Sequence, residues 1–236
     1  DKVMNTTGVE LEDSYETLWG YDETAIDCMK RNTKEGILEV HWSGGGNWET
    51  WMYGRQLDNW DYYFTWAKWI TPSRDIINDF DKEGDEVRKN QAIVYYACTW
   101  SNYYPASNYP FMYKLRSSYN NIYWVRLADI ILMKAEAEAY KGNLAESAKL
   151  VNQIRKRAKL KDLTSDKTGS KEAMIEAVLH ERRLELAFEG ERWFDLCRNN
   201  KVEKYLNGID SRDSGRIRQV RQFDSNSYLL PIPQTA

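Results

Sequence analysis

The sequence predicts a mostly α fold in which pairs of helices form one side and a long irregular, aromatic-rich region packs on them. Residues 126–200 carry sustained helical periodicity. Residues 41–125 are rich in aromatic residues, Asn, Gly and Pro, and show little periodicity. Six of the ten tryptophans lie between residues 42 and 69, so the aromatic side chains are concentrated outside the helical region.

The two ends of the chain are expected to differ. Residues 1–40 look mostly helical, with a break at Gly8, whereas residues 201–236 return to loops. With 236 residues, the chain can form one large domain or two small ones around a substantial core. We expect one domain in three parts: an aromatic-rich part at 1–125, helical pairs at 126–200, and the C-terminal loop segment.

Two predicted helices in the middle of the chain form a hairpin. Apolar residues fall on nearly every face between Arg126 and Lys141, so this helix is expected to pack between neighbours. Gly142-Asn143 then breaks it. The next helix has a single apolar stripe, at Leu144, Ala148, Val151, Ile154 and Ala158. The pair has the size of a tetratricopeptide-type hairpin, and since one pair cannot cover its own outer faces, further pairs are expected ahead of this segment.

A third helix is predicted from about Lys171 to Glu189, followed through Gly190 by a shorter helix that ends near Arg198. Charged residues cluster here, at Glu181, Arg182, Arg183, Glu185, Glu189, Arg192 and Asp195. Glycosidases place two carboxylates on opposite sides of a sugar bond, about 5–10 Å apart. Glu181 and Glu185 lie four positions apart on one helix, so they cannot flank a sugar bond between them. Arginines also lie within reach of both. We therefore interpret the cluster as a structural ion network without a catalytic role.

Composition excludes several classes of protein. The net charge of −3 lacks the basic surplus typical of nucleic-acid binders, and no run approaches the roughly 20 apolar residues that span a bilayer. Three separated cysteines form no zinc-ribbon pair or disulfide framework. With only His41 and His180, the usual transition-metal constellation is also missing, and neither histidine is expected to be catalytic. The sequence implies no cofactor.

The aromatic zone predicts a carbohydrate-binding site. Sugar rings present flat C–H faces on which indole and phenol rings stack, while amide and charged side chains meet their hydroxyl groups. The segment from Trp42 to Arg55 mixes both kinds of side chain around three consecutive glycines, and residues 59–63 and 99–105 repeat this chemistry. The candidate binding residues are Trp48, Trp51, Trp60, Trp100, Asn47, Arg55 and Tyr103. By contrast, Trp66, Trp69 and Trp124 adjoin helical or apolar runs and are expected to be packed.

Several segments resemble the SusD/RagB family. They are YWVRLADIILMKAEAEA from Tyr123, the Asn-x-x-Arg-x-Arg-Ala pattern from Asn152, HERRLELAFEGERWFDL from His180, and the closing YLLPIP from Tyr228. Upstream, the segment from Ile70 to Phe80 is similar to a family helix, and Glu35 to Val40 is similar to the strand before it. The resemblance covers most of the chain, in order.

The resemblance implies a SusD-like α–α superhelix and a surface lipoprotein of a Gram-negative outer membrane. Such a protein binds oligosaccharides without catalysing a reaction on them, and passes them to a SusC-like TonB-dependent transporter. Family members are about twice as long, so by this resemblance the chain is a C-terminal portion, with the lipid anchor expected in the N-terminal half. The rivals are a helical-repeat protein-interaction module, a binder of a non-glycan nutrient, and a glycoside hydrolase.

Overall fold

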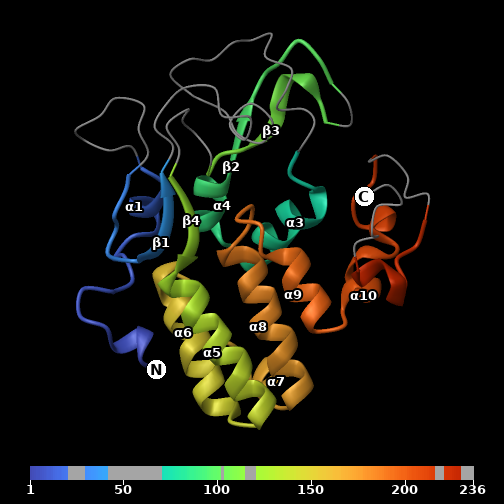
Figure 1. The fold of residues 1–236 in the computed structure, drawn as a ribbon. Helices are drawn as coiled ribbons and strands as arrows, with labels where there is room; N and C mark the ends of the chain where they lie inside the picture. Colours follow the sequence, from blue (N-terminus) through green and yellow to red (C-terminus); the bar gives the residue numbers. More distant parts are fainter. Residues whose placement is uncertain (21–29, 42–70, 102–103, 115–120, 216–220, 230–236) are drawn as a thin grey trace, which may run out of the picture.

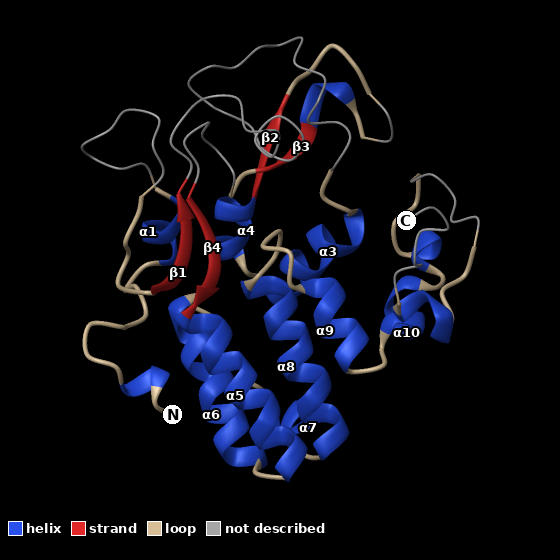
Figure 2. Cartoon of the chain, in the orientation of Figure 1, coloured by secondary structure: helices blue, strands red, loops and turns tan. Residues whose placement is uncertain are grey.

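The computed structural model describes residues 1–20, 30–41, 71–101, 104–114, 121–215 and 221–229. Within these ranges the protein is mainly helical, and two short antiparallel sheets lie at one end of the helices (Figures 1 and 2). No helix of the described ranges is long and apolar enough to cross a membrane. The predicted mostly α fold is confirmed.

The central hairpin is formed by α5 (Leu127–Lys141) and α6 (Leu144–Arg157), as predicted. The α5 helix ends because Gly142 adopts a left-handed conformation, with φ of 87°, and its N–H bonds back to the carbonyls of Ala139 and Glu138. The predicted stripe faces inward: Val151 and Ile154 are fully buried. The turn at Gly142 ends the first helix at the point that allows the apolar faces of both helices to pack together, and this is why the hairpin forms.

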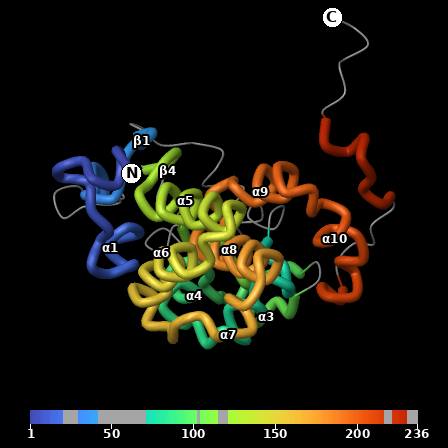
Figure 3. The backbone as a smooth tube through the Cα atoms, turned by 90° about the horizontal axis from the view of Figure 1, so that it is seen from below, coloured from blue at the N-terminus to red at the C-terminus, as the bar shows by residue number. Residues whose placement is uncertain are grey.

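The third core helix is α8 (Lys171–Glu185), preceded by α7 (Ser165–Thr168). Ser170 caps α8 by accepting a hydrogen bond from the N–H of Ala173. Buried side chains from α5, α6 and α8 form the main core, including Ile131, Leu132, Val151, Met174 and Val178. Seen from below, these helices lie side by side in the middle, with α1 on one flank and α10 on the other (Figure 3).

The first part of the chain departs from the expectation of helix. Residues 1–41, where described, contain a 3-10 turn, the short α1 (Tyr15–Trp19) and strand β1 (Gly36–His41). The β1 strand pairs antiparallel with β4 (Asn121–Arg126), which runs directly into α5. The strand-like segment before residue 41 was predicted correctly, but the mostly helical reading of residues 1–40 was wrong.

The region predicted to be irregular contains regular elements: α3 (Arg74–Glu83), α4 (Glu86–Ala92), and strands β2 (Ile93–Tyr96) and β3 (Tyr109–Met112). β2 and β3 pair antiparallel and stand above α3 and α4 (Figure 1). These elements are short, so helical periodicity could not build up over them.

Trp124 was expected to be packed, and the structure corrects this. On β4 its neighbour Tyr123 is buried, while Trp124 itself is 66% exposed. Alternate residues of a strand point to opposite faces, and only the face that carries Tyr123 meets the core. Met133 and Tyr140 likewise leave one side of α5 exposed, although α6 and α8 pack against its other sides.

After α8 the chain turns and forms α9 (Arg192–Arg198) and α10 (Val202–Leu206). The predicted third helix thus ends four residues earlier than expected, at Glu185 instead of Glu189. In the turn, Phe188 takes a left-handed conformation with φ of 66°, which is uncommon for a bulky residue. This turn places Phe188 against α3 and the β2–β3 side of the molecule.

Candidate functional site

The predicted carbohydrate-binding residues lie largely outside the described part of the chain. Six of them are not described, namely Trp48, Trp51, Trp60, Asn47, Arg55 and Tyr103. The same is true of Trp66 and Trp69, which were expected to be packed. Of the predicted binding residues, the structure describes Trp100. The others remain predictions.

Trp100 rests on a cluster of aromatic side chains beside the β2–β3 hairpin. Its ring centroid lies 4.7 Å from that of Tyr109, nearly edge-on at 68°, and 6.1 Å from that of Phe111. Tyr109 and Phe111 are buried, whereas Trp100 is half-buried. The cluster therefore supports Trp100, which as a residue is partly exposed.

Hydrogen bonds attach this aromatic cluster to the start of α3. Tyr104 donates its hydroxyl to the carbonyl of Pro72, 2.9 Å away, and the hydroxyls of Thr71 and Tyr109 lie 3.1 Å apart. The guanidinium of Arg74 lies 4.2 Å above the ring of Tyr104. A half-buried indole on a fixed base is suited to stacking on a flat ligand, because little side-chain freedom is lost on binding.

The charged cluster on α8 belongs to a larger buried ion network that joins both sheets to the helices. We define this network as five basic and five acidic residues, namely Arg88, Lys114, Arg126, Arg155, Arg157, Glu35, Asp85, Glu181, Glu185 and Glu189. The charges of these ten side chains balance, and Arg155 also pairs with Glu83 at 3.0 Å at the edge of the network. Such neutrality is needed because an uncompensated buried charge is strongly destabilising.

Glu185 lies at the centre of the network and is fully buried. One carboxylate oxygen accepts from Arg126 at 2.6 Å and from Arg157, and the other accepts from Arg88 at 3.3 Å. Burial alone would raise the pKa of Glu185, but the charges of Arg157, Arg126 and Arg88 hold this pKa well below its usual range. A carboxylate held ionised and out of reach of solvent has a structural role, as the sequence predicted.

Arg182 and Arg183 also behave as predicted. Arg182 pairs with Asp195 at 2.9 Å and with Asp129 at 2.7 Å, so it joins α8 to α9 and α5. Arg183 pairs with Asp75 at 2.7 Å and with Asp79, which joins α8 to α3. His180 lies 3.1 Å from Glu83, a contact between helices.

Arg192 is the exception, because it joins no ion pair with a described residue. Its Nη1 donates to the carbonyl of Leu179 at 3.1 Å, and its guanidinium carbon lies 4.7 Å above the ring of Tyr205. Burial and the nearby charge of Arg183 lower the pKa of Arg192 to about 10. The expectation that Arg192 belongs to the ion network was therefore wrong.

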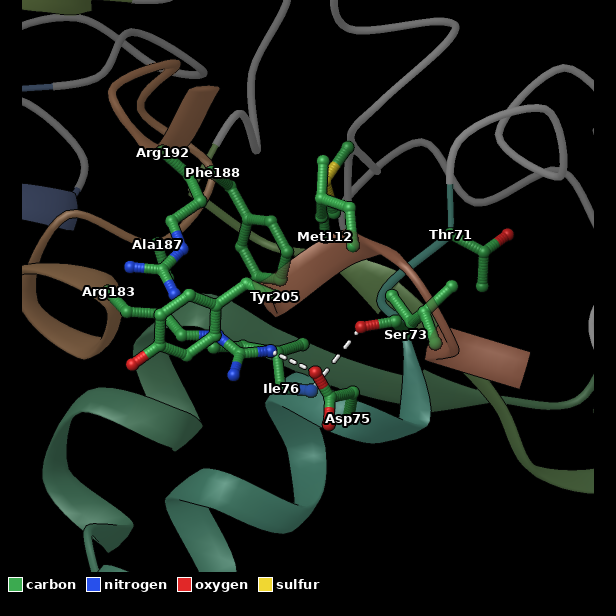
Figure 4. A pocket seen from close by; sticks show the side chains of 12 residues that line it. Thr71, Ser73, Asp75, Ile76, Met112, Arg183, Ala187, Phe188, Arg192 and Tyr205 are labelled. Carbon is green, nitrogen blue, oxygen red and sulfur yellow. Dashed lines mark hydrogen bonds and ion pairs between the residues drawn. The ribbon is translucent and has the colours of Figure 1, made fainter. Parts of the chain in front are cut away.

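Arg192 lines a cavity of about 310 Å³ between α3, the turn after α8, α9 and α10. Figure 4 shows its side chain beside the ring of Tyr205, with Phe188 and Met112 on the same cavity wall. The remaining lining residues are Thr71, Ser73, Asp75, Ile76, Arg183, Ala187, Leu206 and Ile209. Within the described ranges, no group of three or more His, Cys, Asp or Glu is arranged to hold a metal ion.

A sequence model of the SusD family matches residues 87–236. The chain belongs to the SusD family. Two curated relatives come from Formosa agariphila: SusD-like protein P38 is 39% identical over 103 residues, and SusD-like protein P2 is 30% identical over 127 residues. These alignments cover 41% and 50% of this chain, but only 20% and 24% of the relatives.

Solved structures of SusD-family proteins share the fold. Surface glycan-binding protein A from Bacteroides thetaiotaomicron aligns with 99% of this chain and 54% of its own, with a TM-score of 0.66 and 17% identity. A laminarin binding SusD-like protein aligns with 96% of this chain and 51% of its own, with a TM-score of 0.62 and 23% identity. This SusD-family chain therefore spans about half the length of these structures.

Sequence reasoning missed two features of this SusD-family chain. Arg88 and Lys114 enter the buried ion network from α4 and from the segment after β3, far from the α8 cluster in sequence, and no periodicity connects them to it. The cavity at Arg192 was also missed. Arg192, two residues after Gly190, is a weak signal in the sequence, because the same motif supplies the paired arginines of α8.

Proposed function

We propose that this chain contributes to a glycan-binding surface of a longer SusD-family protein. The observation that carries the proposal is the half-buried indole of Trp100, fixed on the aromatic cluster of the β2–β3 hairpin. Two proteins of the same fold support it by their names, which describe surface glycan binding and laminarin binding. Trp48, Trp51 and Trp60 are proposed to complete the site.

We also propose that the glycan is bound and not cleaved. Glycoside hydrolysis needs two carboxylates that flank the sugar bond. In the described cavity at Arg192, the lining carboxylate is Asp75, and both of its oxygens accept hydrogen bonds, one from Arg183 and one from Arg212. The carboxylates of the buried ion network are likewise paired with arginine side chains. Release of new reducing ends from a bound glycan would contradict this part of the proposal.

The site is tested by screening the full-length protein on a glycan array and then measuring affinity for the best ligand by calorimetry. Trp100→Ala should weaken binding by about 1–3 kcal/mol, the scale of losing an anchoring aromatic side chain. Trp124→Ala is the matched control, because Trp124 is an exposed indole on the other sheet. Equal losses in both variants, or none in Trp100→Ala, would exclude Trp100 from the site.

The proposed setting is the outer face of a Gram-negative outer membrane, where the protein would pass oligosaccharide to a SusC-like TonB-dependent transporter. This follows from membership of the SusD family. The test is affinity purification of the full-length protein from its own membranes, followed by identification of co-purifying transporters. If no TonB-dependent transporter is enriched over an unrelated surface lipoprotein, the partnership fails.

A further inference from the structure

The starting point is the unneutralised charge of Arg192. In the described part of the chain, its guanidinium has one hydrogen bond, to the Leu179 carbonyl, and otherwise lies against the ring of Tyr205. A guanidinium carries five N–H donors, so most of its donors are not used by described residues. Arg192 is partly buried, and a cation that loses water without gaining a counterion is disfavoured, so an anion in the cavity would be attracted to it.

The acids whose charges act on Arg192 are Asp195 and Asp79, and Asp195 is already paired with Arg182 and Arg198. The acids that line the cavities with Arg192 are paired as well. Asp75 accepts from Arg183 at 2.7 Å and from Arg212 at 3.1 Å, and Asp79 pairs with Arg183. Burial opposes ionisation of Asp75, but the charges of both arginines lower its pKa. These two acids are therefore committed to other partners, and neither forms an ion pair with Arg192.

The neighbouring space is positively charged as well. A cavity of about 280 Å³ shares four lining residues with the first, namely Asp75, Arg183, Arg192 and Tyr205. Five basic residues line this second cavity, namely Lys82, Arg183, Arg192, Lys204 and Arg212, against two carboxylates, Asp75 and Asp79. Lys204 is paired with Glu176, but the basic side chains of this lining still outnumber the acidic ones, so an anion that approaches Arg192 is attracted.

Part of the lining of the first cavity is apolar. Phe188, Met112 and Ile76, labelled in Figure 4, line this part, and Leu206 and Ile209 line the cavity as well. The volume of about 310 Å³ is at the small end of the range for ligand pockets, roughly 300–1,000 Å³. A ligand of this site should therefore be about one ring in size, with an anionic group and an apolar C–H face.

We propose that this cavity is a ligand site for a small carboxylate of monosaccharide size, such as a hexuronate, with its carboxylate on Arg192 and its ring against Phe188 and Met112. The planar guanidinium fork matches a carboxylate through two parallel hydrogen bonds. Tyr205 helps to fix that fork, because its ring lies under the guanidinium and its hydroxyl donates to Glu176. This site is separate from Trp100 and does not rest on the proposed glycan function.

The first experiment compares ligands on the unaltered full-length protein. Binding of glucuronate, glucuronamide and glucose is measured by calorimetry at low ionic strength. Glucuronate and glucuronamide have nearly the same shape, but only glucuronate is charged, so glucuronate should bind about tenfold more tightly or better. Its affinity should fall as NaCl is added. Equal binding of the acid and its amide, or no binding of glucuronate, overturns the proposal.

The second experiment assigns the site. Arg192→Gln should weaken glucuronate binding to the level of glucuronamide, while Lys82→Gln is the charge-matched control, because Lys82 lines only the neighbouring cavities. Circular dichroism and thermal unfolding check that both variants fold. Unchanged glucuronate affinity in folded Arg192→Gln, or the same loss in both variants, overturns the assignment. Because the ligand comparison needs no variant, the proposal stays testable even if Arg192→Gln does not fold.

Discussion

In the interior, Nη1 of Arg126 donates a hydrogen bond to Oε1 of Glu185 at 2.6 Å. Arg126 lies at the end of β4 and Glu185 at the end of α8. Both side chains are almost completely buried. The same arginine also reaches Glu35, before β1, at 2.7 Å, and Glu189, after α8, at 2.7 Å. One guanidinium therefore fixes the position of the β1–β4 sheet relative to the helices.

Glu185→Gln should destabilise the protein by about 3–5 kcal/mol, because it removes one partner of a buried charge network. Arg88, Arg126 and Arg157 would then lose part of their compensation. Urea unfolding followed by circular dichroism measures the change. Glu146→Gln is the control, since its pair with Lys149 is exposed and should contribute about 0–1 kcal/mol. Ligand affinity of the folded Glu185→Gln protein should not change.

The pH dependence of Glu185 has a definite sign. Its pKa is lower in the folded than in the unfolded state, because the arginine charges outweigh the effect of burial. The resulting stabilisation is present above the unfolded pKa, about 4.3, and is lost as pH falls further toward the folded pKa. Urea unfolding between pH 7 and pH 3 should therefore show a steeper loss for wild type than for Glu185→Gln. Parallel curves would contradict this.

Lys114 should determine how the free energy of unfolding changes at alkaline pH. Burial lowers the pKa of Lys114 to about 8, although Glu189 lies 2.6 Å away. Because the unfolded lysine binds its proton up to a pKa of about 10.4, stability should rise with pH between about 8 and 10. At about 1.4 kcal/mol per pKa unit, the rise amounts to about 3 kcal/mol.

Lys114→Met is the variant that isolates this effect. The rise should be absent in it, whereas Lys149→Met, at an exposed position, should retain it. The measurement is urea unfolding at pH 7, 8, 9 and 10 for all three proteins. A wild-type profile that falls over this range, after subtraction of the Lys114→Met profile, would show that the folded pKa of Lys114 is not lowered.

The core of the helical bundle provides a test of the fold. Ile131→Ala should cost about 2–5 kcal/mol, because it removes a fully buried side chain and leaves a cavity between α5, α6 and α8. Met133→Ala on the same helix is the control, since Met133 is exposed and should change stability by less than about 0.5 kcal/mol. An unchanged denaturation midpoint for Ile131→Ala would contradict the packing of α5.

The helices could be predicted where long periodic patterns and a strong turn signal coincided. The Gly142-Asn143 break and the stripe through Val151 and Ile154 place the central hairpin correctly. Trp124 was misjudged because an apolar run in a strand does not tell which face meets the core. Strand β4 pairs with β1, some 80 residues earlier, and that pairing has no local signal.

The charged motif on α8 was predicted as structural, but its partners were only partly identified. A helix pattern shows that Glu181 and Glu185 share a face, yet it cannot show that Arg88 meets both of them from another helix. For the same reason Arg192 was wrongly assigned to the ion network from the sequence pattern. Only the three-dimensional arrangement shows that Asp75 and Asp79 have paired with Arg183 and left Arg192 beside a cavity.

The last prediction concerns Trp48 and Trp51, which lie outside the described residues. They follow three glycines and are interleaved with Asn47 and Arg55, a mixture typical of sugar-binding loops. Replacing either indole by Ala should weaken oligosaccharide binding by about 1–3 kcal/mol. The thermal unfolding temperature should hardly change, because the described core is formed by buried side chains of α5, α6 and α8.

Tryptophan fluorescence distinguishes this prediction from a general loss of structure. Addition of the glycan found by array screening should shift the emission of the full-length wild-type protein, and the shift should shrink in Trp48→Ala and Trp51→Ala. Trp19→Phe is the control, because Trp19 is a buried indole packed on Tyr15 and Tyr123 and should report no ligand. If the shift survives in both alanine variants, the sugar contacts lie elsewhere, and Trp60 and Trp100 become the residues to test next.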